Sequence, residues 1–507
     1  MKIKNISLAM LATVFAASCS NEQIVETNAD PTGEAIDFRP SVASPTRAVV
    51  TTIGTLGDFN VLAKGYHSNN GTLYRTFMIG EYDEDNTLIP GYAEKSSGTM
   101  WKLTKNVYWP TDVNNAVFWA FTDLSTNDKN ENNDETNKAN ETNNGSCVTC
   151  GTVIFNPTTG PEIVEYKPLK ADLSKPIGQY NGWFDGDSQR DLVSAFTFQT
   201  TRNPHVSLTF KHLLSQIEIN AMSKHTVANV ESRNVKIRGA WIVNATALGN
   251  LNAKFSTETK TDNPEWSPGG SKDSYGTYYA DARKIQVSLD GKPTINVLGT
   301  GGHGNLMLIP QAVTSWTGSD ATTTNDAYLL LLCRVDLGHK GDVTVNPDEE
   351  AVSPTNKDGV HYHQQFPVMK RYDENAYGLT AVPLPINWER GKKYTYNLNI
   401  CGENTGAGQY PPNIPTNNDA VRKYLEKFIA GDFKVNGTGC DDMEEADRKK
   451  VIDIITTIPD GKTVGSYVLD DPIDFTVTVS DWDDGGTWTN GSDNKASESK
   501  TNTVNEE

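Results

Sequence analysis

The spacing of apolar residues is the feature that most constrains the fold, because they recur at every second position in short runs. The clearest run, Tyr394-Thr-Tyr396-Asn-Leu398-Asn-Ile400, places aromatic and aliphatic residues on one face and polar residues on the other. Successive side chains of a strand point to opposite sides, so this alternation predicts a strand with one buried face. Further short apolar runs recur along the chain, separated by Gly, Pro, Asn, Asp, Ser and Thr, and they predict a mainly β protein.

These further runs are predicted to be strands or to continue the series of strands. They are Ile36–Phe38, Phe59–Ala63, Tyr74–Ile79, Trp101, Tyr108–Pro110, Val117–Phe121, Val206–Phe210, Ile217–Ile219, Val235–Ile237, Trp241–Val243, Ile285–Val287, Leu306–Ile309, Tyr328–Val335 and Ile473–Val479.

The length of 507 residues exceeds one ordinary domain, so we expect two. The first is predicted over 48–223 and the second over 224–488. Inside the second, the period changes: Val421, Tyr424, Leu425 and Phe428 follow helical spacing, and Met443–Ile455 is charged with an apolar stripe. These two stretches predict a helical insertion at about 417–456. The polar tail, 489–507, is expected to be disordered.

The N-terminus has the pattern of an export signal. Lys2 and Lys4 precede the short apolar stretch Ile6–Ala17, and Cys19 stands where a bacterial lipoprotein carries its acylated cysteine. We predict a signal peptide over 1–18, and a lipidated tether with a first strand over 19–47. Acyl chains such as palmitate on Cys19 would anchor the precursor to a membrane. The alternative is an ordinary signal peptide with an incidental cysteine.

Charge and motifs argue against most other functions. The net charge of −19 excludes nucleic acid as a partner, because a polyanion is bound by clustered Lys and Arg. Residues 299–304 match the spacing of a dinucleotide loop, but a predicted strand follows where the phosphates need a helix N-terminus. The sequence has no GxSxG or HExxH motif. We therefore expect no catalytic site, no cofactor and no enzyme activity.

The sequence predicts no metal site and at most a local disulfide. His361 and His363 would share one face of a strand, a geometry that metals use, but the sequence names no third ligand. We expect an exposed or hydrogen-bonded pair and no metal. Besides Cys19 the chain has five cysteines, and an odd number cannot all be paired in disulfides. The Cys147-Val-Thr-Cys150 segment is expected to be a local disulfide or two free thiols.

An ordered set of short motifs covers most of the chain. The motifs are the lipoprotein signal, Ile36-Asp-Phe38, Thr46-Arg47-Ala48, Phe59-Asn-Val61-Leu-Ala63, Trp101, Tyr108-Trp109-Pro110, Asp191-Leu192, Leu208-Thr-Phe210-Lys-His212-Leu-Leu-Ser-Gln-Ile217, Leu306-Met-Leu-Ile-Pro310-Gln311 and Trp388-Glu-Arg-Gly391-Lys-Lys-Tyr394-Thr-Tyr396. In this order they resemble the fimbrillin family of type V pili.

The resemblance implies two transthyretin-like antiparallel β-sandwich domains and export as a lipoprotein. It also implies cleavage after an arginine, and Arg47-Ala48 fits that processing site. Arg39 fits poorly because Pro40 follows it. Cleavage would free the first strand, with Ile36 and Phe38, and a strand of a neighbouring subunit would fill the groove. The alternative is that Arg47 is an ordinary linker residue.

One repeated tripeptide suggests which strand fills the groove. Ile36-Asp-Phe38 recurs as Ile473-Asp-Phe475 near the C-terminus. A donor strand should present the same alternating side chains as the strand that it replaces. We therefore expect Ile473, Phe475, Val477 and Val479 to be donor residues. The alternative is that they form the native last strand of the second domain.

The function expected from these features is a structural subunit of a cell-surface pilus. Its partners would be other pilus subunits, with the outer membrane of a Gram-negative bacterium holding the lipid of the precursor. The alternative is a lipid-anchored adhesin or glycan-binding module that does not polymerise and contacts a host or bacterial surface ligand.

Overall fold

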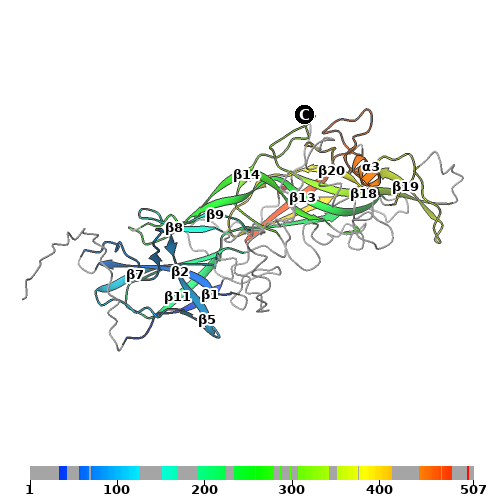
Figure 1. Ribbon diagram of the computed structural model, residues 1–507. Helices are drawn as coiled ribbons and strands as arrows, with labels where there is room; N and C mark the ends of the chain where they lie inside the picture. Colours follow the sequence, from blue (N-terminus) through cyan, green and yellow to red (C-terminus); the bar gives the residue numbers. More distant parts are fainter. Residues whose placement is uncertain are drawn as a thin grey trace, which may run out of the picture.

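The structure is a computed structural model, and it describes residues 33–42, 56–67, 70–122, 124, 151–168, 191–223, 233–256, 258–278, 285–286, 297, 306–341, 351–374, 376–413, 445–469, 471–481 and 500–501. Figure 1 shows two blocks of β-sheet that follow one another along the molecule. We call them the N-terminal block, at the left, and the C-terminal block, at the right. The prediction of a mainly β protein is confirmed.

The N-terminal block is a closed barrel of seven strands in the order β1-β11-β10-β7-β2-β5-β6. These are β1 (Asp37–Val42), β2 (Phe59–His67), β5 (Gly91–Ser97), β6 (Met100–Leu103), β7 (Val113–Thr122), β10 (Val193–Gln199) and β11 (His205–His212). Strand β11 shows why the barrel closes around its core: Val206, Leu208 and Phe210 are fully buried, and the residues between them are exposed. A two-stranded sheet of β3 (Glu81–Tyr82) and β4 (Leu88–Ile89) accompanies the barrel.

The C-terminal block consists of two larger sheets and one small one. The five-stranded sheet has the order β16 (Leu306–Leu308), β12 (Ser215–Met222), β22 (Lys392–Asn399), β23 (Asp474–Asp481), β24 (Lys500–Thr501). The eight-stranded sheet has the order β19 (Val360–Phe366), β18 (Tyr328–Lys340), β13 (Arg233–Asn252), β9 (Gly160–Tyr166), β8 (Thr152–Asn156), with β14 (Glu265–Tyr278) and β15 (Ile285–Gln286) paired to β13 and β20 (Gly378–Pro383) paired to β18. The small sheet pairs β17 (Ala312–Val313) with β21 (Ile386–Asn387).

Apolar residues from both larger sheets form one core between them. Ile219 and Tyr396 of the five-stranded sheet share a buried cluster with Ile237 and Leu331 of the eight-stranded sheet. Two packed sheets around one core make this block a β-sandwich.

A second buried cluster joins the two blocks. It contains Trp119 of β7 in the barrel and Leu251 and Phe255 at and after the end of β13. The rings of Trp119 and Phe255 meet edge to face at 5.2 Å. Because β13 is 20 residues long, it reaches from the core of the sandwich to this cluster.

The predicted boundary at residues 223 and 224 does not coincide with the sheets. Strand β12 was expected to close the first domain, but it pairs with β22 over Gln216–Met222 and so belongs to the sandwich. Strands β8 and β9 also lie in the predicted first domain, and they join the eight-stranded sheet through β13. Strand pairing of this kind is non-local, so the order of strands along the sequence does not reveal it.

Two pairings depart from the expected antiparallel arrangement. Strand β1 runs parallel to β11, and β12 runs parallel to β22. A parallel pair needs a long crossover between its strands. In both cases the paired residues are far apart in sequence, as Asp37 and His205 are, so the chain between the two strands is long enough for the crossover.

Most of the predicted strands are confirmed, and two stretches are not strands. Tyr74–Ile79 forms one isolated bridge to β2, between Ile79 and Ala63, and Tyr108–Pro110 precedes β7 without pairing. The second predicted helix is confirmed as α3 (Glu445–Thr456), the one helix among the described residues, while the first lies outside them. Helix α3 covers the outer face of the eight-stranded sheet, where Ile452 and Ile455 join a buried cluster. None of the described helices combines the length and apolar content that crossing a membrane requires.

Candidate functional site

The candidate site is the groove between β11 and β6 that β1 fills. We call this groove the seat of β1. Strand β1 pairs with β11 along its whole length, from Asp37 opposite His205 to Val42 opposite Phe210. On its other side it pairs with β6 at two residues only, Asp37 and Phe38. Removing β1 would therefore leave one long free edge, that of β11, and a short one on β6.

The inward face of β1 completes the barrel core. Ile36 is 2% exposed and Phe38 is 0% exposed. The Phe38 ring lies 5.8 Å from the ring of Phe59 and 6.4 Å from that of Phe118, both edge to face. Without β1, the rings of Phe59 and Phe118 would line an apolar trough.

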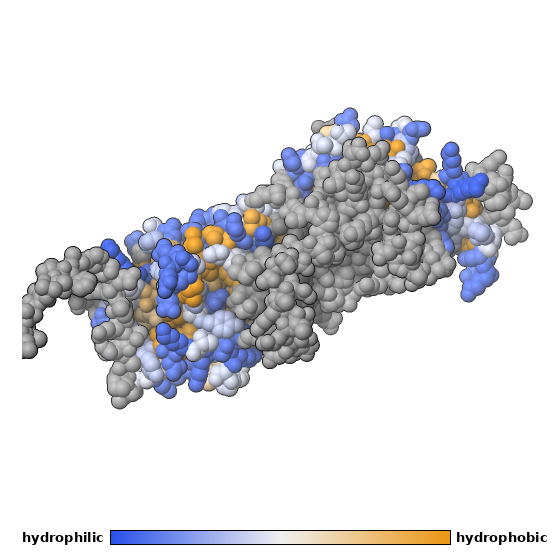
Figure 2. All heavy atoms as spheres, viewed as in Figure 1, coloured by the Kyte–Doolittle hydropathy of each residue, from blue (hydrophilic) through white to orange (hydrophobic). Residues whose placement is uncertain are grey.

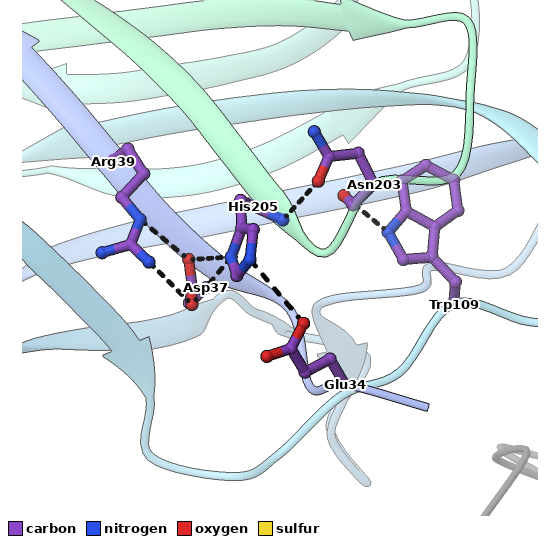
Figure 3. Close-up of polar contacts among 6 residues, drawn as sticks. All are labelled: Glu34, Asp37, Arg39, Trp109, Asn203 and His205. Atoms are coloured by element: carbon purple, nitrogen blue, oxygen red, sulfur yellow. Dashed lines mark hydrogen bonds and ion pairs between the residues drawn. The ribbon is translucent and has the colours of Figure 1, made fainter. Parts of the chain in front are cut away.

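The outward face of β1 carries a cluster of charged side chains around His205 (Figure 3). His205 Nδ1 lies 3.1 Å from both carboxylate oxygens of Asp37, and His205 Nε2 lies 3.7 Å from Glu34 Oε2. Arg39 Nε lies 3.4 Å from Asp37 Oδ1. His205 is thus the one residue of β11 in this cluster. It lies between the carboxylates of Asp37, in β1, and Glu34, which precedes β1.

Backbone contacts fix the position of His205. The His205 backbone N–H donates to Asn203 Oδ1 at 2.9 Å, and Trp109 Nε1 donates to the Asn203 carbonyl at 3.0 Å (Figure 3). The Asp37 backbone N–H donates to the carbonyl of Pro204 at 2.8 Å. The turn before β11 and the start of β1 are therefore tied together.

The residues predicted for lipidation and processing lie outside the described residues. These are Cys19, Arg47 and Ala48. Described residues resume at Leu56, so the predicted cleavage site falls on the connection between β1 and β2. Its role stays a prediction.

Strand β23 contains three of the four predicted donor residues, and the fourth, Ile473, immediately precedes it. It pairs antiparallel with β22 over eight residues, with Phe475 opposite Leu398 and Val479 opposite Tyr394. Phe475 is 5% exposed and belongs to the core of the sandwich, while Ile473, Val477 and Val479 are half-buried against it. In the monomer, β23 is thus a native strand of the five-stranded sheet, where the alternative interpretation expected the last strand, and the short β24 follows it.

Over nine positions, the two segments around the repeated tripeptide share four identical residues. Residues 34–42 read EAIDFRPSV, and residues 471–479 read DPIDFTVTV. The inward positions of β1 are occupied by Ile, Phe, Pro and Val, and those of β23 by Ile, Phe, Val and Val. Sequence reasoning found the tripeptide but missed His205, because nothing in the sequence places it beside Asp37.

The two histidines predicted to share a face do so, and the structure adds a third. His339 of β18 lies opposite His361. The ring centroids of His339 and His363 are 4.8 Å apart, and those of His361 and His363 are 5.1 Å apart. His361 Nδ1 lies 3.1 Å from the carbonyl of Gly341, so it is hydrogen-bonded. No three His, Cys, Asp or Glu residues of the described part of the chain are arranged to hold a metal ion.

A polar cavity of about 510 Å³ opens on the barrel. The residues around it include Tyr66 and His67 at the end of β2, Asn114 and Asn115 in β7, and Arg202 before β11. Burial raises the pKa of Tyr66 to about 12, so its phenol is neutral at physiological pH. Amides, a guanidinium and an aromatic face are groups that bind hydroxyl-rich ligands.

The exposed apolar surface offers one further candidate. Figure 2 shows apolar residues gathered over the part of the molecule where Figure 1 labels β2 and β8. Among the described residues, the exposed large hydrophobic side chains include Ile89 on β4 and Ile154 on β8. Among the described residues, Cys333 and Cys401 are buried free thiols, and Cys147 and Cys150 lie outside that part of the chain.

Comparison with known proteins agrees with the resemblance found in the sequence. Residues 186–409 match the model of the fimbrillin-like family. A solved fimbrial protein from Bacteroides vulgatus is 16% identical, with 73% of this chain and 96% of that chain covered and a TM-score of 0.42. The tip fimbrial protein Mfa3 from Porphyromonas gingivalis is 10% identical, with 72% and 93% covered and a TM-score of 0.27. None of the curated proteins matches the sequence.

Proposed function

We propose, on the premise that residues 186–409 are fimbrillin-like, that the chain is a structural subunit of a type V pilus on the surface of a Gram-negative bacterium. It is exported as a lipoprotein anchored through Cys19, and an arginine-specific protease then hydrolyses the Arg47–Ala48 bond. Strand β1 leaves, and a strand of a neighbouring subunit takes its place. The subunit has no catalytic role.

The observation that carries this proposal is the way β1 is built into the barrel. It is short, lies at the start of the described chain, and fills the core with two fully buried side chains, Ile36 and Phe38. A cut in the connection between β1 and β2 would leave it attached only by non-covalent contacts. The vacated seat would present unpaired backbone groups of β11 beside an apolar trough, which is the kind of surface that binds an added strand.

The chemistry of β23 makes it a suitable occupant of this seat. Ile473, Phe475 and Val479 are identical to Ile36, Phe38 and Val42, the residues that they would replace. The fourth residue, Val477, would bring a backbone N–H where Pro40 has none. To act as a donor, β23 must leave β22 and the core that holds Phe475. During assembly β23 would therefore leave its position beside β22 and enter the seat of β1 in a neighbouring subunit.

Limited proteolysis tests the proposal. Purified chain is treated with an arginine-specific protease and separated on a denaturing gel without boiling, and we expect a ladder of polymers. Arg47→Ala should abolish the ladder, and Arg39→Ala is the matched control that should leave it unchanged. Complete cleavage after Arg47 with only monomers present would contradict the polymer function.

The polar cavity supports a second candidate function, a surface lipoprotein that binds a glycan without polymerising. The residues that line the cavity include Asn114, Asn115 and Arg202. Binding of the intact chain to an array of glycans, lost in Asn115→Ala, would favour this function. A glycan signal that Asn115→Ala leaves unchanged would count against the cavity as the binding site.

A further inference from the structure

We infer that the empty seat of β1 accepts a donor strand in one direction only, parallel to β11, with Asp474 opposite His205. This inference rests on the proposed function and adds the direction and register of the donor strand, which that function leaves open. A strand with alternating side chains can enter a groove in either direction, because both directions place the same alternate set inside. The individual side chains therefore decide.

The inward side chains favour the direction of β1. In that direction Phe475 takes the place of Phe38, whose socket is 0% exposed and lies beside the ring of Phe59 at 5.8 Å. Val477 takes the place of Pro40. In the reverse direction Val477 would enter the Phe38 socket and leave a cavity, and Phe475 would crowd the position of Pro40.

The outward charges favour the same direction. In the uncleaved chain His205 contacts Asp37 at 3.1 Å and Glu34 at 3.7 Å. Both carboxylates are lost when the first strand leaves. In the direction of β1, Asp474 takes the place of Asp37 and Asp471 that of Glu34, so His205 regains two carboxylates.

The far end of the groove gives the third match. Ser41 Oγ donates to Thr209 Oγ1 at 3.3 Å, and Ser41 Oγ also reaches the backbone of β11. In the direction of β1, Thr478 brings a hydroxyl to the same place. In the reverse direction Asp474 would lie beside Thr209, and Thr478 would lie beside His205. Arg39 is the one charged residue of β1 without a counterpart.

The contact between His205 and Asp474 is expected to select the register more than to add affinity. The His205 side chain is 42% exposed, so solvent screens its interaction with a carboxylate. Exposed ion pairs of this kind change an equilibrium or a rate by about two- to fivefold. Charge complementarity at an interface acts mainly on encounter and on the choice of register.

Cross-linking between subunits reads the direction of the donor strand. The first variant carries Thr478→Cys with Thr209→Cys, and the second carries Thr478→Cys with His205→Cys. Thr478 and Thr209 are exposed in the monomer, so the first pair leaves the core intact. Both variants are made in a background in which Cys147, Cys150 and Cys440 are serine. After protease treatment each is exposed to a short thiol cross-linker, and Arg47→Ala with the same cysteines is the uncleaved control.

We expect covalent dimers and higher species from the first pair and none from the second. The two candidate positions of Thr478 differ by four residues, about 13 Å along the strand, which a short reagent does not span. Cross-links from the second pair alone, in chains that still polymerise, would overturn the direction while leaving the pilus function standing. Cleaved chains that never polymerise would overturn both.

A charge exchange tests His205 itself. His205→Glu places like charges opposite Asp474, and we expect polymer formation after cleavage to slow by about fivefold or more. Adding Asp474→Lys should restore the rate, which a purely structural effect of His205 would not allow. A rate that Asp474→Lys fails to restore would refute the contact between His205 and Asp474.

Discussion

Replacing Phe38 by alanine removes the largest side chain that β1 places in the barrel core. Phe38 is 0% exposed, and its ring meets those of Phe59 and Phe118 edge to face. An aromatic side chain buries about 200 Å², which at about 25 cal/mol per Å² corresponds to about 5 kcal/mol. Measured losses for buried Phe→Ala substitutions are about 3–5 kcal/mol. We therefore expect the barrel of the uncleaved chain to lose about 4 kcal/mol.

Hydrogen exchange by mass spectrometry is the suitable assay, because a chain with two blocks need not unfold in one step. A loss of about 4 kcal/mol should speed exchange of the most protected barrel amides by about a thousandfold. The effect should appear in peptides from β6 and β11, and peptides from β13 and β18 should change little. Val42→Ala, a half-buried position at the end of the same strand, is the control and should cost about 1 kcal/mol.

The outcome also reports on processing. If β1 is removed on cleavage, Phe38→Ala should have no effect on the stability of assembled polymers. A loss below about 1 kcal/mol in the uncleaved chain would refute the assignment of Phe38 to the barrel core. Polymers weakened by Phe38→Ala would show that β1 stays in place.

Two further predictions concern buried polar groups of the C-terminal block. Arg334 and Asp336 form a fully buried ion pair, with Arg334 Nε 2.8 Å from Asp336 Oδ2, so Arg334→Ala should cost about 3–5 kcal/mol in denaturant titration. The double change Arg334→Met with Asp336→Leu should cost much less, and equal losses would contradict an uncompensated charge as the cause. Burial raises the pKa of Cys401 to about 12 and that of Cys333 well above its usual range. Neither thiol should react with iodoacetamide at pH 8 until the chain unfolds, whereas labelling in the native state at the rate of an exposed thiol would show that the block opens there.

Local pattern was sufficient to predict most strands but not all of them. The alternation of Tyr394–Ile400 and of Val206–Phe210 lies in the residues themselves, and both became strands with one buried face. Tyr74–Ile79 is also rich in apolar residues but forms one isolated bridge to β2, because strand formation also needs a partner along its length. The hairpin of β8 and β9 was missed, and it joins its sheet through β13, a strand that is distant in the sequence.

Only part of the candidate site could be predicted from the sequence. The repeated Ile-Asp-Phe and the buried character of Ile36 and Phe38 could be read directly. His205 could not, because 168 residues separate it from Asp37 and nothing in its neighbourhood marks it. The third histidine, His339, was missed for the same reason, as it lies on the neighbouring strand.

By itself the sequence determined the class of the fold, because side-chain alternation is a local property that a strand must satisfy wherever it lies. It also showed that Ile36-Asp-Phe38 recurs as Ile473-Asp-Phe475 near the C-terminus. Only the tertiary structure decided that β1 runs parallel to β11, that β12 belongs to the sandwich, and that an aspartate of the first strand meets His205. These are pairings between distant segments, and their free energy depends on the whole set of neighbours and not on any one segment.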